Sequence, residues 1–223
     1  MMDDVKKLVK KLLEDNKNAH GYDHVERVLD LALNFSKGEN VNIEILSLIA
    51  LLHEVDDYKL FGDEYAANLT NAKNIMNKCS ISSEIQDVVC SEILRIGYGR
   101  RLKGLAPKTI EGKLASDADM CEALGVNGFL RAYAYGISID RPLFVRDSFP
   151  TSNVDSSTYN SKYGDSTITI VFQKLLKLKD LMLTKPGRDE ALTRHKITVD
   201  MLHNLFRELN APEWEEFLNN YLK

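Results

Sequence analysis

Two histidines and a group of carboxylates lie where apolar side chains would be expected. His24 and His53 each fall on the apolar face of a segment with helical spacing. A buried imidazole needs partners for its ring nitrogens. Three acidic residues, Glu54, Asp56 and Asp57, follow His53 at once. Inward-facing histidines and carboxylates on neighbouring helices are the donors that a divalent metal binds, so these residues indicate a candidate metal site.

A third segment adds two aspartates, Asp117 and Asp119, to an otherwise apolar helical pattern. Each lies on a stripe of apolar residues, so periodicity does not choose between them. The same residues also fit a different interpretation. A histidine on an apolar helix face is more often a hydrogen-bonded core residue, and the aspartates could cap helices or form salt bridges. From spacing alone, a metal site and a structural polar network are both open.

The elements that must position these residues are helices, because apolar residues recur at helical spacing through most of the chain. The expected helices are 5–13, 22–37, 43–53, 64–76, 85–96, 110–124, 128–136, 171–183, 188–209 and 212–221. Segment 139–166 is rich in small polar residues and contains Pro142 and Pro150, which predicts a long irregular loop. Residues 167–171 fit either a short strand or a helix start. We expect an all-α bundle that forms a single domain over residues 1–223.

Composition and charge narrow the class of protein. The net charge is −4 and the basic residues are scattered, which argues against nucleic-acid binding. No apolar run approaches the roughly 18 residues of a membrane span, and the N-terminus lacks the apolar segment of a signal peptide. Three widely spaced cysteines, Cys79, Cys90 and Cys121, do not form a disulfide framework. We therefore expect a cytoplasmic protein without a membrane or nucleic-acid partner.

The order and spacing of several motifs resemble the HD superfamily, specifically the small bacterial HD-domain phosphohydrolases. The matching stretches are Ala19–Val28, Ala50–Lys59, Thr109–Lys113 with Asp117–Asp119 and Ala123–Gly125, and Lys174–Met182 with Arg194–Lys196. The resemblance covers nearly the whole chain. It implies an HD-domain helical bundle and a metal-dependent phosphohydrolase whose substrate is a phosphate ester, expected to be a nucleotide.

The resemblance also implies roles for individual residues. One divalent cation would be held by His24, His53, Glu54 and Asp119. A donor set of two histidines and two carboxylates suits Mn, Fe, Co, Ni or Zn, and Mg less well. Asp57, one helical turn after His53, is expected to act as a general base or to position the attacking water, as an acidic residue at that offset does in related HD hydrolases.

Three basic residues, Lys59, Arg27 and Arg131, are candidates to bind the substrate phosphate through charge and, for the arginines, bidentate hydrogen bonds. For Lys59 and Arg131, surface exposure or ion pairing is the favoured interpretation. For the remaining histidines, His20, His195 and His203, we expect solvent-facing or capping positions.

The chain departs from the family pattern in three places. The naming His-Asp doublet is His53-Glu54, the opening motif has His20-Gly21 where His-Asp is common, and Ser91–Tyr98 lacks the histidine that relatives often carry there. These departures leave open a degenerate HD domain that binds nucleotide or metal without turnover, or a structural helical protein. Trp214 and Phe217 near the C-terminus fit either internal packing or a homodimer seam.

Overall fold

The structure, a computed structural model, describes residues 1–14, 21–150 and 164–223. Its first half contains α1 (Met2–Leu13), α2 (Tyr22–Phe35), α3 (Ile43–Leu52), α4 (Tyr58–Phe61), α5 (Asp63–Asn68), α6 (Thr70–Lys78), α7 (Ser83–Ile93) and α8 (Tyr98–Leu102). The second half contains α9 (Ile110–Glu122), α10 (Gly125–Ser138), α12 (Thr167–Gln173), the 3₁₀ helix η1 (Leu175–Leu181), α13 (Lys185–Glu208) and α14 (Pro212–Tyr221). The described residues form no strand, which confirms the all-α prediction.

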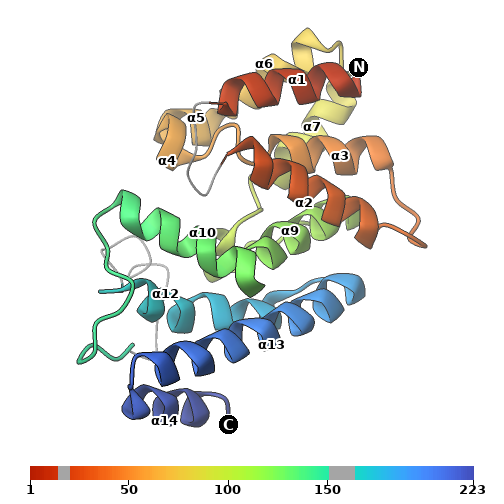
Figure 1. Cartoon of the computed structure of the whole chain (residues 1–223). Helices are drawn as coiled ribbons and strands as arrows, with labels where there is room; N and C mark the ends of the chain where they lie inside the picture. The colour runs from red at the N-terminus through yellow and green to blue at the C-terminus, as the bar shows by residue number, and fades with distance from the viewer. Residues whose placement is uncertain (15–20, 151–163) are drawn as a thin grey trace.

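Helices α2, α3 and α9 pack against one another and form the centre of one group of helices. Helix α3 is buried from Leu46 to Leu52, as its nearly continuous apolar sequence predicts. Its other sides are covered by α1 and α7. Figure 1 shows α9 and α10 between this group and a second group formed by α12, α13 and α14. Helices α9 and α10 thereby connect these two groups of helices.

Three buried carboxylates hold the starts of helices. Asp56 accepts hydrogen bonds from two backbone amides in the first turn of α6, Glu92 from two just before α9, and Asp117 from two just before α13. The amides at a helix start have no partner within the helix and carry partial positive charge, so an ionised carboxylate suits both properties. These acids are therefore structural in the described fold.

Two predicted helices differ from the structure. The expected helix 171–183 is wrong as a continuous α-helix, because the backbone leaves helical geometry at Lys174 and continues as η1. Leu175 and Leu178 are buried with the three-residue repeat of a 3₁₀ helix, a spacing close to the α-helical one. The expected helix 64–76 is divided at Leu69, which adopts the left-handed conformation and separates α5 from α6.

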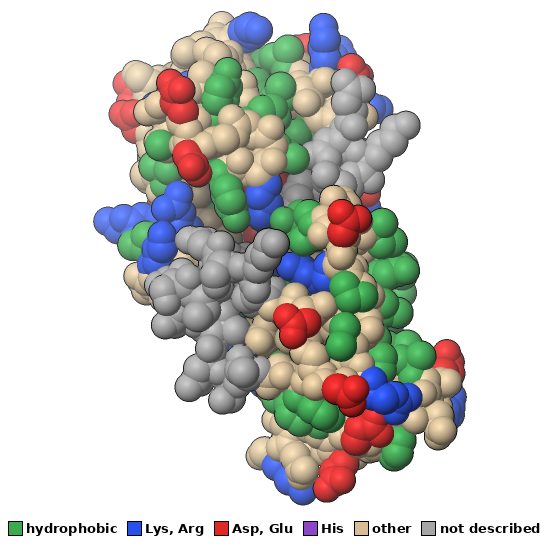
Figure 2. All heavy atoms as spheres, turned by 90° about the vertical axis from the view of Figure 1, so that its left-hand side faces the viewer, with side chains coloured by type: hydrophobic (Ala, Val, Ile, Leu, Met, Phe, Trp, Pro, Cys, Tyr) green, Lys and Arg blue, Asp and Glu red, His purple; other side chains and the backbone are tan. Residues whose placement is uncertain are grey.

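The described parts of the predicted loop, residues 139–150 and 164–166, contain no helix, and residues 151–163 lie outside the described residues. Of the two alternatives for residues 167–171, the structure shows the helix start. None of the described helices is both long and apolar enough to cross a membrane. On the face drawn in Figure 2, basic, acidic and apolar side chains are interspersed.

Candidate metal centre

Four side chains from three helix ends meet at one point. His24 lies in the first turn of α2, His53 directly follows α3, Glu54 follows it in the next turn, and Asp119 lies in the last turn of α9. Each offers one ligand atom, and these atoms all lie within 4.8 Å of one another. The close packing of α2, α3 and α9 brings the three helix ends together. The structure therefore brings together the four residues that the sequence nominated as ligands.

The distances define a compact cluster with the imidazoles innermost. His24 Nε2 lies 3.6 Å from Glu54 Oε1 and 3.5 Å from Asp119 Oδ1. His53 Nε2 lies 3.6 Å from the same Glu54 oxygen and 3.8 Å from Asp119 Oδ1. The histidine side chains are 1% and 3% exposed, whereas Asp119 keeps 20% of its surface exposed. The cluster is thus reached from the side of its carboxylates.

The orientation of His53 is set by the end of its own helix. Its Nδ1 lies 2.7 Å from the carbonyl oxygen of Ala50, one of the carbonyls that has no partner within α3. Because a carbonyl only accepts, Nδ1 must carry the proton and donate it. In the neutral ring this leaves Nε2 with its lone pair directed at Glu54 and Asp119, as a metal ligand requires.

In the cluster, both ring nitrogens of His24 and Nε2 of His53 are buried and have no hydrogen-bond partner among the described residues. Buried polar atoms in folded proteins are nearly always hydrogen-bonded, so unpartnered ones need an explanation. Both Nε2 atoms face the two carboxylates. A cation shared by these donors would satisfy them at once, and the residues present therefore fit a divalent metal ion.

Electrostatics at the cluster favour positive charge. Burial alone would lower the pKa of His24, but the neighbouring carboxylates of Asp119, Glu122 and Glu54 outweigh it and raise that pKa to about 10. Burial works against the charged form of Asp119, yet the neighbouring imidazoles of His24 and His53 hold the pKa of that carboxyl below its usual value. The cluster attracts a proton or a cation.

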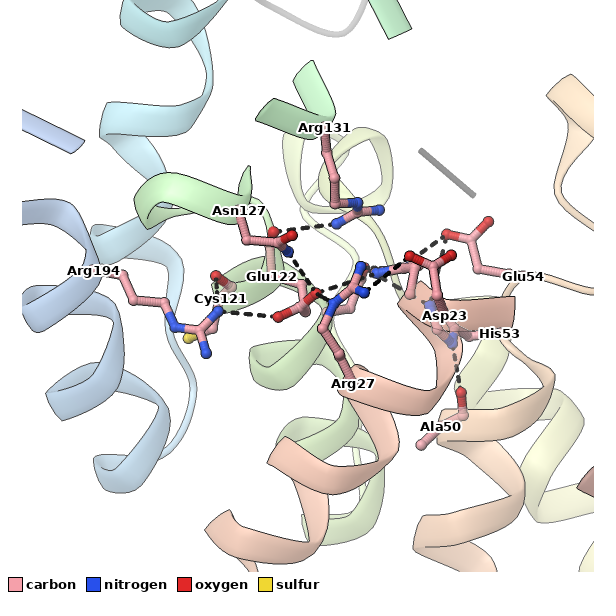
Figure 3. A network of polar contacts seen from close by, with 12 residues as sticks. Asp23, Arg27, Ala50, His53, Glu54, Cys121, Glu122, Asn127, Arg131 and Arg194 are labelled. Carbon is pink, nitrogen blue, oxygen red and sulfur yellow. Dashed lines mark hydrogen bonds and ion pairs between the residues drawn. The ribbon is translucent and has the colours of Figure 1, made fainter. Parts of the chain in front are cut away.

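One residue of the site, Glu122, was not found by sequence reasoning. Its buried carboxylate accepts hydrogen bonds from Arg27 Nε at 2.7 Å, Asn127 Nδ2 at 3.0 Å and Arg194 Nη1 at 3.1 Å (Figure 3). Burial would raise the pKa of Glu122, but the neighbouring His24, Arg27 and Arg194 side chains outweigh it and hold that pKa at about 2. The available signal was its position three residues after Asp119, on the same helix face.

The two aspartates that periodicity could not separate have different surroundings. Asp119 lies in the cluster. Asp117 is fully buried elsewhere and receives hydrogen bonds from the amides of Leu183 and Thr184 and from the Thr184 hydroxyl. Burial raises the pKa of Asp117, although these hydrogen bonds oppose the shift. Among the described contacts, Asp117 serves the start of α13.

Three residues predicted for catalysis or phosphate binding, Asp57, Lys59 and Arg27, each contact other side chains or backbone amides. Asp57 accepts the backbone amide of Lys59 at 2.8 Å and thereby begins α4. The Lys59 ammonium lies 5.8 Å and 5.3 Å from the ring centres of Tyr58 and Tyr135. Arg27 forms ion pairs with Glu122 and with Asp23.

Two basic residues face the charge of the cluster. Arg131 is half-buried, donates to the carbonyl of Glu122 at 3.2 Å, and interacts electrostatically with Asp119 and Glu54. Lys174, at the break between α12 and η1, interacts with the same two carboxylates. Burial lowers the pKa of both side chains. Lys174 was not among the predicted phosphate ligands.

Two of the other histidines, His195 and His203, are not part of the four-residue cluster. His20 is outside the described residues. His203 is half-exposed, and its Nδ1 lies 2.6 Å from Glu215 Oε1. His195 is half-buried, and burial lowers its pKa.

Comparisons with known proteins agree with this geometry. No family model matches the chain. In sequence it is 28% identical over 210 residues to the uncharacterized protein YpgQ of Bacillus subtilis. The match covers 93% of each chain. In structure it is similar to an HD-superfamily hydrolase from Bacillus thuringiensis, with 27% identity, a TM-score of 0.70, and coverage of 94% of this chain and 97% of that one.

Two further structures share the fold. A crystal structure of YpgQ in complex with ADP gives a TM-score of 0.69 at 25% identity and covers 93% of this chain and 94% of that one. A Lactobacillus plantarum protein gives a TM-score of 0.83 at 23% identity, with coverage of 94% and 97%. The chain thus resembles the HD-superfamily hydrolase from Bacillus thuringiensis in both fold and sequence. Together with the His/Glu/Asp cluster, this likeness supports a metal-dependent hydrolase.

Proposed function

We propose that this protein is a metal-dependent phosphohydrolase that acts on a phosphate ester of a nucleotide. The observation that carries the proposal is the convergence of His24 Nε2 and His53 Nε2, both buried and without hydrogen-bond partners among the described residues, on the carboxylates of Glu54 and Asp119. The likeness to an HD-superfamily hydrolase supports the reaction class.

His24, His53, Glu54 and Asp119 would hold the cation. A divalent ion at this place supplies Lewis-acid chemistry, lowering the pKa of a water ligand and neutralising charge on phosphoryl oxygens. Two imidazoles with two carboxylates suit Mn, Fe, Co, Ni or Zn better than Mg. The rings are held by packing and, for His53, by the hydrogen bond to Ala50, so little reorganisation accompanies binding.

Arg131 and Lys174 bind the substrate phosphate in this proposal. Both cations interact with the Asp119 and Glu54 carboxylates, so their positive charge is close enough to the proposed metal to attract a phosphate bound there. Arg131 adds the bidentate geometry that suits phosphate oxygens. The crystal structure of the relative YpgQ with ADP supports a nucleotide as the substrate class. Arg27 forms two ion pairs, which favours support of Glu122 over substrate contact.

Asp57 acts as the general base or positions the attacking water. It lies three residues after Glu54 in the chain, at the start of α4. One of its oxygens accepts the Lys59 amide, and a carboxylate has further lone pairs with which to accept a proton from water. Lys59 lies beside it and contributes positive charge near the same point.

The first experiment measures the metal content of the purified protein and its hydrolysis of nucleotides, before and after chelation. We expect about one ion per chain, and loss of both the ion and the activity in His53→Ala with unchanged helicity. The matched control is His203→Ala, which removes a histidine outside the cluster and keeps metal and activity. Metal content in His53→Ala equal to that of the parent would show that the site is placed wrongly.

A second candidate function is a degenerate HD domain that binds metal or nucleotide without turnover. The His53-Glu54 doublet favours it, because the family motif has aspartate at the second position. The same experiment separates the two functions: a metal-loaded protein that binds ADP but hydrolyses no nucleotide or phosphate ester would support the degenerate domain.

A further inference from the structure

We propose that Glu122 is a positioning residue that fixes the ring of His24 for metal binding, and that Arg27, Arg194 and Asn127 hold Glu122 in place. The inference rests on the proposed metal site and goes beyond it, because it assigns a role to a residue that does not belong to the four-ligand cluster. It also gives the two arginines a shared role in supporting a ligand.

Glu122 lies on the side of the His24 ring that is turned away from the cluster carboxylates. Glu122 Oε2 lies 3.9 Å from His24 Nδ1, the ring nitrogen opposite the one that faces Glu54 and Asp119. That nitrogen has no hydrogen-bond partner among the described residues. Glu122 is the carboxylate that it faces. A metal-binding histidine usually directs its second ring nitrogen at a carboxylate or carbonyl, which fixes the tautomer and ring orientation.

The two histidines of the cluster are then supported in parallel ways. His53 donates from Nδ1 to the carbonyl of Ala50, which leaves Nε2 for the cluster. His24 lies in the first turn of α2, where no carbonyl of its own helix is free to accept in the same manner. Its support has to come from another element, and Glu122 on α9 supplies an acceptor with a full negative charge.

The carboxylate of Glu122 is itself held from three sides. Arg27 lies on α2, three residues after His24 and so on the same helix face. Asn127 reaches it from α10 and Arg194 from α13. Figure 3 shows these three side chains arranged around Glu122. The side chain is 4% exposed, so its charge is well shielded from water and depends on these partners.

This arrangement keeps Glu122 ionised and limits its movement. An ionised acceptor stabilises the form of His24 that has its proton on Nδ1 and its lone pair on Nε2. Replacement of the carboxylate by an amide of the same size would remove the charge while retaining the packing. The expected consequence is a lower affinity for the metal with the fold retained, because removing such a support typically costs about 10- to 100-fold in affinity.

The test compares Glu122→Gln with Glu92→Gln. Both replace a buried glutamate by an amide, but Glu92 accepts from the Lys108 and Thr109 amides at the start of α9. Glu92 is remote from the cluster. Its carboxylate lies against Gly112, which is seven residues before Asp119 on α9 and so about 10 Å from it along the helix. Zn²⁺ affinity is measured by competition with a chromophoric chelator, and folding by thermal unfolding in a chelator.

We expect Zn²⁺ affinity to fall at least tenfold in Glu122→Gln and to stay within about twofold of the parent in Glu92→Gln. Nitrogen NMR of the histidine rings in the zinc-loaded protein gives a second readout, with the His24 and His53 resonances assigned by through-bond correlations from each ring to its own backbone. The His24 Nδ1 signal should shift in Glu122→Gln while the His53 signals stay unchanged.

Two results would overturn the inference. One is Zn²⁺ affinity in Glu122→Gln equal to that of the parent. The other is an affinity loss with unchanged His24 signals, which would indicate a general loosening of the fold. Failure of the parent protein to bind Zn²⁺, Mn²⁺ or Ni²⁺ is a different outcome, because it removes the proposed metal site itself and the inference with it.

Discussion

Thr184 is joined to Asp117 by two hydrogen bonds to the same carboxylate oxygen, one from its backbone amide and one from its hydroxyl, each 2.7 Å long. Thr184 also caps α13 by accepting the amide of Gly187. A methyl group on Gly187 would lie 2.3 Å from the same Asp117 oxygen. This contact therefore fixes where α13 begins and how closely it approaches α9.

Asp117→Asn is expected to destabilise the fold and to leave metal affinity nearly unchanged. Asparagine keeps one accepting oxygen for the Thr184 donors but replaces the other by an NH2 group that cannot accept the Leu183 amide, and the loss of this bond and of the negative charge should cost about 2 kcal/mol in the free energy of unfolding. Asp119→Asn should show the opposite pattern, with weak metal binding and near-parental stability in a chelator. Denaturant unfolding and metal titration of both variants check the pair. The same phenotype in both would contradict the separation of their roles.

Glu54→Asp should lower metal affinity, by about tenfold. Glu54 Oε1 already lies 3.6 Å from both His24 Nε2 and His53 Nε2, so the longer side chain reaches the cluster. Removing one methylene withdraws the oxygen by roughly a C–C bond length, more than a ligand site tolerates without adjustment. Metal titration measures the change. A gain in affinity or hydrolysis would mean instead that the glutamate limits the site.

Lys174→Ala is expected to lower ADP affinity about tenfold and to leave metal affinity within about twofold, since a charged hydrogen bond contributes about 1.5–3 kcal/mol. The variant removes a cation that interacts with Asp119 and Glu54. Lys185→Ala is the matched control, because Lys185 is highly exposed and pairs with Asp189 at the start of α13. Calorimetric titration with ADP in the presence of metal checks the prediction. Equal losses in the two variants would point to a general charge effect.

The stability of the fold should decline between about pH 10 and pH 12 through Tyr221. Burial raises the pKa of Tyr221 to about 12, and its hydroxyl donates to the Phe172 carbonyl at 2.9 Å. In the unfolded chain the phenol loses its proton near pH 10, so the unfolded state gains stability as pH rises through this window. Tyr221→Phe should be about 1 kcal/mol less stable at pH 8, with the difference shrinking above pH 10. Denaturant unfolding at several pH values measures it. A constant difference would contradict the shift.

Much of the fold could be predicted because helical spacing and apolar content agree along most of the chain. The exceptions have local causes. Leu175 and Leu178 are spaced for both a 3₁₀ helix and an α-helix, and only the backbone at Lys174 distinguishes them. Leu69 has a left-handed backbone that a leucine seldom adopts. The sequence has no glycine at this position to predict the division between α5 and α6. The cytoplasmic location, the single domain and the homodimer stay predictions.

The candidate site was predictable to the extent that motif order supplied what periodicity lacked. Spacing nominated His24 and His53 but treated Asp117 and Asp119 alike, because both are carboxylates on apolar stripes. Buried carboxylates that cap helix starts and those that face a histidine look the same in a sequence. Glu122 was missed for that reason: its function depends on side chains from α2, α10 and α13, which only the tertiary structure brings to it.

The cluster residues come from three segments that are far apart in the chain, near residues 24, 53 and 119. An ion held by all of them is a cross-link that closes two long loops, and it binds the unfolded chain poorly. Such a ligand at 100 times its dissociation constant adds about 2.7 kcal/mol to folding stability. The metal-loaded and metal-depleted forms would then differ in resistance to proteolysis, so the supply of the ion would govern how long the protein persists as well as whether it is active.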